Sequence, residues 1–421
     1  MSAKVEAPKG TRDVLPDEGA LRARIVGAAS SLFDAYGYGR IATPTFEQTE
    51  LFVRGVGQST DIVRKEMYTF DDLGGRSMTL RPEGTAPVVR AFVEHGMHKL
   101  PLPVKLWYTA PMFRYEAPQA GRLREHTQIG AEALGADDPL LDAELIALLG
   151  AIYDALGIPG VRLRIGSLGD GPSRAAYRAE LVAYLNSRAA DLPADARERA
   201  GENPMRLFDS RDPAVAAVME GAPRILDRLG DDAAAHHRAV LGALDAVGIA
   251  YDEDATLVRG LDYYTKTVFE FTCDRLGAQS GIGGGGRYDG LVEELGGPPT
   301  PGVGFGTGIE RIVLALTADG APGPAPTARV YFAGIGPEAR AELFPVMTRL
   351  RAAGVAATAD TLGRSMKGMM KQAAASGAAA CVILGERELA EGIATLRDMS
   401  TGEQRPVPLS ELESVLAKEH V

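Results

Sequence analysis

The residues best suited to chemistry gather in the stretch LVRGLDYYTKTVFEF, residues 257–271. It sets a lone cation, Arg259, beside Gly260, and an arginine next to glycine can approach a phosphate or carboxylate closely because no side chain blocks the ligand. Tyr263 and Tyr264 offer flat apolar walls with hydroxyl tips, which suit a small planar ligand that also needs hydrogen bonds. Tyrosines beside a strand are equally typical of a core or an interface, so this stretch alone leaves both interpretations open.

Two glycine-rich runs follow, GIGGGGRYDG at 281–290 and GVGFGTG at 302–308. The first contains the letters GxGxxG, but it continues as a turn-like RYDG where a dinucleotide-binding motif needs a helix, and neither run spells a Walker motif. In the second run, alternate glycines strip one face of a predicted strand, so a flat base could lie on it. Arg311, in the first turn of the helix that follows, projects where phosphates would end. A Walker-type ATPase and a dinucleotide dehydrogenase are therefore disfavoured.

Two predicted strands, 104–116 and 125–134, are joined by a loop rich in Pro, Gly and Arg. Period-two geometry puts Met112, Arg114 and Glu116 on one face of the first strand. The return strand presents these residues on one face: His126, Gln128, Gly130 and Glu132. Such alternation is also typical of the wet face of an antiparallel sheet, but a glycine on the polar face favours a ligand floor.

A third site segment comes earlier in the chain. The strand 77–80 delivers Glu83 to a turn beside Gly84, where a ligand can reach it, and Thr85 is expected to cap the next helix. Carboxylates at 83 and 132 suit a cationic amine or an imidazole. Arginines that converge from distant segments, Arg114, Arg259 and Arg311, suit a polyphosphate, whose transfer is catalysed chiefly by positioning and charge stabilisation. The residues alone thus favour ATP together with a small amine.

Length and composition limit the classes of protein to which the chain can belong. At 421 residues the chain is expected to form two or three domains, and 45% hydrophobic with 24% charged residues is typical of a soluble globular protein. We expect no membrane span, because no apolar run is long enough, and no secretory signal, because the N-terminus lacks an apolar core. Cys273 and Cys381 fit neither a disulfide framework nor a zinc site, so we expect a reducing, cytoplasmic location. A net charge of −11 argues against DNA binding, although a local basic face could hold RNA.

The predicted fold class is α+β, an antiparallel sheet flanked by helices. We expect a first part of the core at 1–168, a helical insertion at 169–247, the second part of the core at 248–316, a linker at 317–328 and an α/β domain at 329–421. The first helix is predicted from Asp17, as N-cap, to Tyr36, followed by a strand at 40–43 and a helix-like run at 46–57. Arg364, Lys367 and Lys371 on one side of a C-terminal helix suit RNA phosphates or a solvated face.

The motifs together resemble class II aminoacyl-tRNA synthetases and, within them, the histidyl-tRNA synthetase family over essentially the whole chain. The opening KGTRD at 9–13 is similar to that family's start, and Thr43-Pro44 with the run to Gly57 resembles the class dimer-interface motif. FRYE at 113–116 and GFG at 304–306, with Glu310-Arg311, resemble the second and third class motifs. LVRGLDYYT at 257–265 and GGGGRYDGL at 283–291 resemble the two signatures special to the histidine enzyme.

The resemblance implies a histidine–tRNA ligase that forms histidyl-adenylate and pyrophosphate from histidine and ATP with Mg²⁺, then charges tRNA(His). It implies Arg114 and Arg259 as catalytic cations, no structural metal, an anticodon-binding domain at 329–421 and a homodimer. The implied ATP site is Arg114, Glu116, Arg122, Gly306, Gly308 and Arg311. The implied histidine site is Glu83, Gly84, Thr85, Arg114, Gln128, Glu132, Arg259, Tyr263, Tyr264 and Tyr288.

The chain departs from the family pattern in the loop at 117–127, where Ala117 replaces a frequent basic residue and EHT precedes Gln128. This loop faces the acceptor end of the tRNA, so the nucleotides that it reads do not follow from the resemblance. Two alternatives stay open: a non-catalytic regulatory subunit of ATP phosphoribosyltransferase and an RNA-binding scaffold. The retained arginines and the C-terminal domain disfavour both.

Overall fold

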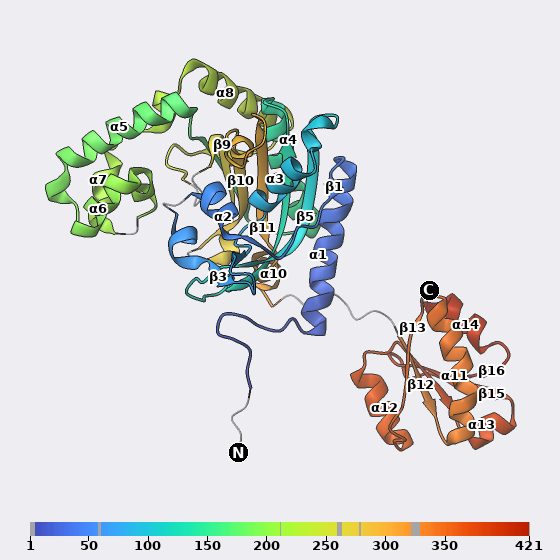
Figure 1. Cartoon of the computed structure of the whole chain (residues 1–421). Helices are drawn as coiled ribbons and strands as arrows, with labels where there is room; N and C mark the ends of the chain where they lie inside the picture. Colours follow the sequence, from blue (N-terminus) through green and yellow to red (C-terminus); the bar gives the residue numbers. More distant parts are fainter. Residues whose placement is uncertain are drawn as a thin grey trace. The chain divides into compact units, whose positions relative to one another are not determined.

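The computed structural model describes residues 5–57, 60–210, 212–258, 263–277, 279–320 and 329–420 (Figure 1). The chain divides into two compact units, Met1–Gly323 and Pro324–Val421. Each unit has its own sheet and its own hydrophobic core. No helix in the described ranges is both long and apolar enough to cross a membrane.

An eight-stranded sheet organises the first unit, in the order β1-β5-β6-β11-β10-β9-β7-β8. The strands are β1 (Gly39–Arg40), β5 (Val104–Phe113), β6 (Glu125–Leu134), β7 (Val161–Ser167), β8 (Tyr251–Glu253), β9 (Thr265–Cys273), β10 (Gly281–Arg287) and β11 (Gly302–Gly308). The six central strands pair antiparallel, while β1 and β8 join the edges parallel to their neighbours. The predicted antiparallel sheet flanked by helices is confirmed.

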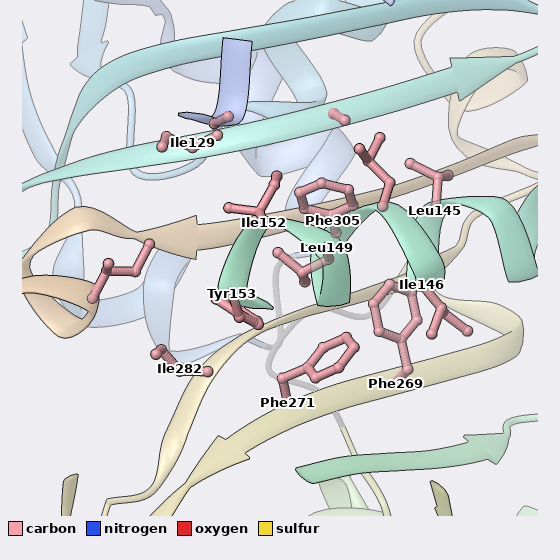
Figure 2. Close-up of a cluster of buried hydrophobic side chains, with 14 of the residues drawn as sticks. Ile129, Leu145, Ile146, Leu149, Ile152, Tyr153, Phe269, Phe271, Ile282 and Phe305 are labelled. Atoms are coloured by element: carbon pink, nitrogen blue, oxygen red, sulfur yellow. The ribbon is translucent and has the colours of Figure 1, made fainter. Parts of the chain in front are cut away.

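One face of this sheet forms the main core. It is covered by α1 (Pro16–Ala35), α4 (Pro139–Leu156), α8 (Asp231–Ala246) and α10 (Ile309–Thr317). Odd-numbered residues of three strands point into it, among them Ile129 of β6, Phe269 of β9 and Phe305 of β11. Figure 2 shows α4 laid across these strands, with Ile152 and Tyr153 among the side chains that meet them. Because side chains alternate along a strand, the even-numbered residues of β6 and β11 face the other side.

That other side is bordered by a smaller, three-stranded sheet in the order β2-β4-β3. Its strands are β2 (Phe46–Gln48), β3 (Tyr68–Asp71) and β4 (Ser77–Leu80), accompanied by α2 (Thr49–Val56), a π-helical turn η1 (Ile62–Glu66), α3 (Thr85–Glu94), the turn η2 (Met97–Lys99) and α9 (Leu291–Glu294). A second hydrophobic cluster, which includes Val88, Phe92 and Tyr288, packs α3 and α9 against this face of the large sheet.

Helices dominate the segment between β7 and β8. They are α5 (Gly171–Ser187), α6 (Ala194–Glu202) and α7 (Pro213–Glu220), with the 3₁₀ turns η3 (Ala189–Asp191), η4 (Pro204–Asp209) and η5 (Ile225–Arg228), followed by α8. Figure 1 shows α5, α6 and α7 gathered into one group. The last helix, α8, packs instead on α4, where Val240 and Leu244 belong to the main core.

The second unit carries a five-stranded sheet in the order β13-β12-β14-β15-β16. Its elements are β12 (Arg329–Gly334), α11 (Pro337–Ala352), β13 (Ala356–Ala359), α12 (Met366–Ala375), β14 (Ala380–Leu384), α13 (Glu386–Ala390), β15 (Ile393–Asp398), β16 (Gln404–Pro408) and α14 (Leu412–His420). Three strands are parallel and the last two antiparallel. Local pattern reasoning missed the short α13 and the edge strand β16, whose two prolines obscure its strand character.

Several local predictions are wrong. Asp17 does not cap α1: the helix begins at Pro16, with Leu15 as N-cap, because proline already has the backbone angle of a first helical residue. The predicted strand 40–43 is only Gly39–Arg40, and the run 46–57 divides into β2 and α2. The glycines at 281–286 form most of strand β10 between β9 and β11, and the predicted turn-like continuation follows at 289–290.

Candidate active site

A cavity of about 750 Å³ opens on the face of the large sheet opposite the main core. The face predicted from the alternation in β6 and β11 lies here, with Gln128 and Gly306 in its wall. Of the residues predicted for the site, these line it: Glu83, Thr85, Arg114, Glu116, Arg122, Gln128, Tyr263, Tyr264, Tyr288, Gly306, Gly308 and Arg311. They come from six separated stretches of the chain that the sheet brings together.

Glycines make room for the polar side chains of the floor. Strands β11 and β6 pair with Gly304 opposite Glu132 and Gly306 opposite Gly130. A methyl group at position 304 would overlap the Glu132 carboxylate, and one at 306 would overlap the Gln128 amide. Alternate glycines therefore do more than expose a flat surface: they leave the volume that these two side chains occupy.

Glu132 lies at the centre of a buried hydrogen-bonded network and is fully buried. Its Oε1 accepts from the Thr85 hydroxyl at 2.8 Å, and its Oε2 accepts from the Tyr288 hydroxyl at 2.5 Å. The Tyr108 hydroxyl lies 3.4 Å from Oε1. Burial, together with the nearby Glu83, raises the pKa of Glu132 to about 8, although the hydrogen bonds from Tyr288 and Thr85 favour the ionised form. Glu132 does not itself line the cavity, but the side chains of Thr85 and Tyr288 that donate to it do.

Glu83 occupies the start of α3 and is also buried. Its carboxylate accepts from the backbone N–H groups of Thr85, at 2.7 Å, and Ala86, at 3.0 Å. The predicted capping role of Thr85 is therefore wrong: Glu83 satisfies the free N–H groups of the helix, and the Thr85 hydroxyl turns to Glu132 instead. Burial raises the pKa of Glu83 against these hydrogen bonds. Each carboxylate oxygen accepts one of these hydrogen bonds and can accept another, and Glu83 lines the cavity.

The adjoining part of the cavity is cationic. Arg114, just beyond the end of β5, donates from Nε to the Pro82 carbonyl at 2.8 Å, and its Nη1 lies 3.9 Å from Glu116 Oε1. Arg122 Nη1 donates to Glu116 Oε2 at 3.4 Å. Arg311, from the first turn of α10, donates from Nε and Nη2 to the carbonyls of Gly281 and Gln279. Arg114 and Arg122 from one hairpin and Arg311 from a distant segment thus line one cavity, next to the acidic network.

The structure places the other predicted residues as follows. Gly84 does not line the cavity; it packs against Tyr108, whose ring occupies the place of a side chain at 84. Arg259, with Gly260, lies outside the described residues. His126, predicted on the polar face, does line the cavity, and burial together with the Arg114 charge lowers its pKa to about 3, so it is neutral.

Sequence reasoning missed three residues of the site. Tyr108 pairs with Gly130 in the β5–β6 hairpin and passes its hydroxyl between Gln128 and Glu132. Glu66, from η1, and Glu270, from β9, also line the cavity. Tyr108 had a signal: a glycine on a ligand-facing strand leaves space that a large residue on the neighbouring strand fills. The register of the hairpin was needed to identify that residue.

Class II aminoacyl-tRNA synthetases are built on an antiparallel sheet of this kind flanked by helices, and this chain is one of them. Residues 10–312 match the family model described as histidyl-tRNA synthetase, and residues 329–419 match the one described as anticodon binding domain. The chain belongs to the histidyl-tRNA synthetase family.

Individual relatives agree along the whole chain. A histidine–tRNA ligase from Rubrobacter xylanophilus is 51% identical over 409 residues, which is 95% of this chain and 96% of the relative. The crystal structure of apo histidyl-tRNA synthetase from S. aureus superposes with a TM-score of 0.82 at 38% identity, and covers 98% of this chain and 100% of that one. The protein is therefore an aminoacyl-tRNA synthetase with histidine–tRNA ligase activity.

One solved relative bears on the rival function. A structure from Bacillus halodurans described as an ATP phosphoribosyltransferase regulatory subunit/histidyl-tRNA synthetase has a TM-score of 0.65, 25% identity and covers 88% of this chain. Its likeness is lower on each of these measures than that of the S. aureus synthetase. The regulatory-subunit alternative is therefore not favoured.

Proposed function

We propose that the cavity described above is where this enzyme joins histidine to ATP and then passes the histidyl group to tRNA(His). In the first step a histidine carboxylate oxygen bonds to the α-phosphorus while the bond from that phosphorus to the bridging oxygen breaks, so pyrophosphate leaves. In the second step the terminal ribose 3′-OH attacks the histidyl carbonyl and AMP leaves. The observation that carries the proposal is that Arg114 and Arg311 line the same cavity as Thr85 and Tyr288, whose hydroxyl groups donate to the buried Glu132.

The acidic part of the cavity is assigned to histidine. Glu132 accepts from an imidazole N–H, with the rings of Tyr263, Tyr264 and Tyr288 around the imidazole. Tyr263 and Tyr288 already meet edge to face, with ring centroids 5.7 Å apart. The α-amino group is assigned to Glu83, Thr85 and Gln128, with Gly84 at the turn. A site that hydrogen-bonds the ring leaves buried polar groups unpaired when an apolar isostere enters, so it rejects such isosteres strongly.

The cationic part is assigned to ATP, which arrives with Mg²⁺. Arg114, with Arg259, holds the α-phosphate and the histidine carboxylate, and Glu116 accepts from the adenine amino group. Arg311 and Arg122 hold the terminal phosphates, and Gly306 and Gly308 face the nucleotide. Arg311 uses two of its five N–H donors on the carbonyls of Gly281 and Gln279, so its position is set while donors remain for a phosphate.

We extend the proposal to the whole chain. The catalytic core is assigned to 1–168 and 248–316, with the helical insertion at 169–247, a linker at 317–328 and anticodon recognition at 329–421. We further propose a homodimer that works in the cytoplasm. The presence of a matching anticodon binding domain supports tRNA as the partner of the second unit.

Amino-acid-dependent exchange of pyrophosphate into ATP tests the proposed activation step. We expect exchange with histidine and none above background with the other standard amino acids, because only histidine presents an N–H to Glu132 and a second ring nitrogen to the tyrosines. Charging of tRNA(His) measured with the same enzyme tests the second step. Exchange with several amino acids, or none with histidine, would contradict the assignment.

The pKa of Glu132 predicts a pH dependence of histidine binding. With a pKa of about 8 the carboxyl group of the free enzyme is mostly protonated at pH 6.5 and mostly ionised at pH 8.5. The ionised carboxylate accepts an imidazole N–H more strongly than the neutral carboxyl group does, so the KM for histidine should fall by up to about tenfold between these two pH values. Exchange kinetics across this range measure it. Glu132→Gln is the control, because it shares every titration of the substrates and lacks only that of residue 132. Its KM should lack the fall that Glu132 adds, and a profile parallel to the wild type would contradict the prediction.

A further inference from the structure

The N-terminal segment, residues 8–12, lies against the loop that joins β5 to β6, more than a hundred residues away in sequence. The Gly10 carbonyl accepts from the Arg124 backbone N–H at 2.8 Å, and the Lys9 carbonyl accepts from Arg124 Nη1 at 3.4 Å. The segment is itself held in place: Thr11 closes a turn onto the Pro8 carbonyl, and Arg12 pairs with Glu18 of α1 at 2.5 Å. It is therefore an anchored support for the loop.

Gly10 is required by the contact that it makes. Its φ is +88°, a conformation that favours glycine, and a Cβ there would lie 2.7 Å from both Cγ and Cδ of Arg124 and 3.0 Å from Pro118. Any side chain at position 10 thus displaces the stem of Arg124. The residue is fixed by contact as well as by backbone geometry.

Arg124 transmits this support to the arm that carries Arg114 and Glu116. Its carbonyl accepts from the Arg114 N–H at 2.9 Å, and its Nε donates to the Glu116 carbonyl at 3.3 Å. Its guanidinium lies 3.8 Å from the ring centroid of Tyr115, the residue between them. On the other side of the arm the Tyr115 N–H donates to the Glu66 carbonyl at 2.8 Å. The three consecutive residues of the arm are held from both sides.

We propose that Arg124 is a positioning residue for ATP, through which the N-terminal segment holds the arm carrying Arg114 and Glu116. This inference rests on the proposed assignment of these two residues to the nucleotide. Arg124 acts on the backbone of the arm rather than on the reacting atoms. Histidine meets the arm only through its carboxylate on Arg114, and the network around Glu132 shares none of these contacts. Loosening the arm should therefore weaken ATP binding far more than histidine binding.

A double-mutant cycle in pyrophosphate exchange tests the inference with the full-length enzyme. We expect Gly10→Ala and Arg124→Met each to raise the KM for ATP roughly tenfold, about what one good hydrogen bond is worth, with the KM for histidine changed less than about twofold. In the Arg124→Met background Gly10→Ala should add little, because a methyl at position 10 disturbs the arm by displacing the Arg124 guanidinium, which that background already lacks.

Gly37→Ala is the matched control. Its φ is +77° and no atom lies within 4 Å of the position of a new Cβ, so it carries similar backbone strain with no contact to displace. It should leave both KM values at the wild-type level. Thermal unfolding of each variant shows whether it folds. If Gly10→Ala does not fold, Arg124→Lys replaces it: lysine cannot make all the contacts of the planar guanidinium, so its KM for ATP should lie between those of the wild type and Arg124→Met.

Three results would overturn the inference: additive effects of Gly10→Ala and Arg124→Met, a parallel rise of both KM values, or the same change in Gly37→Ala. Failure of the proposed nucleotide assignment would give a different result. If Glu116→Gln leaves the KM for ATP unchanged, the adenine role of Glu116 is wrong, whereas the coupling between positions 10 and 124 is measured independently of it.

Discussion

Arg114→Gln should lower kcat for histidine-dependent pyrophosphate exchange by roughly a thousandfold, because it removes a positive charge at the point where negative charge develops on the transferred phosphorus. Arg114 is only half buried and lies beyond the last residue of β5, where its one close side-chain hydrogen bond goes to the Pro82 carbonyl. Loss of that bond costs stability about 1 kcal/mol, so the protein should stay folded. The effect on kcat is therefore catalytic.

Steady-state kinetics of pyrophosphate exchange measure the expected loss of kcat, and thermal unfolding measures the expected small change in stability. Arg162→Gln is a suitable control, because it removes an arginine from an exposed ion pair with Asp274 on an edge-proximal strand, away from the cavity. It should keep full activity. An Arg114→Gln enzyme within tenfold of the wild type would show that the cavity does not use this cation as proposed.

Asp142→Asn should cost about 3 kcal/mol of the free energy of unfolding, because it leaves the buried Arg287 guanidinium with only the partly exposed carboxylates of Asp137 and Asp289. Both Asp142 and Arg287 are fully buried, and Arg287 Nε lies 3.1 and 3.2 Å from the two carboxylate oxygens. His236 Nε2 lies 3.3 Å from the same carboxylate. Arg287 ends β10 directly before Tyr288, so the ion pair ties α4 to the strand that leads into a residue lining the cavity.

The fluorescence of Trp107, the single tryptophan and a buried residue of β5, reports urea unfolding of the first unit alone. Asp137→Asn is the matched control: Asp137 is half exposed and lies 3.5 Å from Arg287, so its loss should cost less than about 1 kcal/mol. Equal shifts of the urea midpoint in the two variants would contradict the argument.

The pKa of the Asp142 carboxyl group also predicts how the stability of the protein changes as the pH falls. Burial alone would raise the pKa of Asp142, but hydrogen bonds from His236 and Arg287 bring it below its usual value of 3.8. Its contribution to stability is therefore complete above that value and is lost as the pH falls through the lower pKa of the folded state. The Asn variant lacks this contribution at every pH, so the two unfolding curves should converge in acid.

The sequence by itself determined the kinds of residue at the site and much of the local structure. Period-two patterns placed Gln128 and Glu132 on one face of a strand, and β6 with β11 has the predicted geometry. The strand predicted at 125–134 is β6, with the same bounds. These predictions succeeded because each depends on residues a few positions apart, where backbone periodicity acts directly.

Tertiary structure decided what lies across from what. The register that puts Tyr108 opposite Gly130 depends on a hairpin whose loop length did not follow from composition, and a shift of one residue would turn the pocket face to the core. Strand β10 exists because β9 and β11 supply hydrogen-bonding partners on both sides, since five glycines give it no strand propensity of its own. The support of Arg124 by Gly10 joins segments more than a hundred residues apart. Such contacts form only when the whole chain packs, because the free energy that holds them comes from burial and pairing between segments rather than from either segment alone.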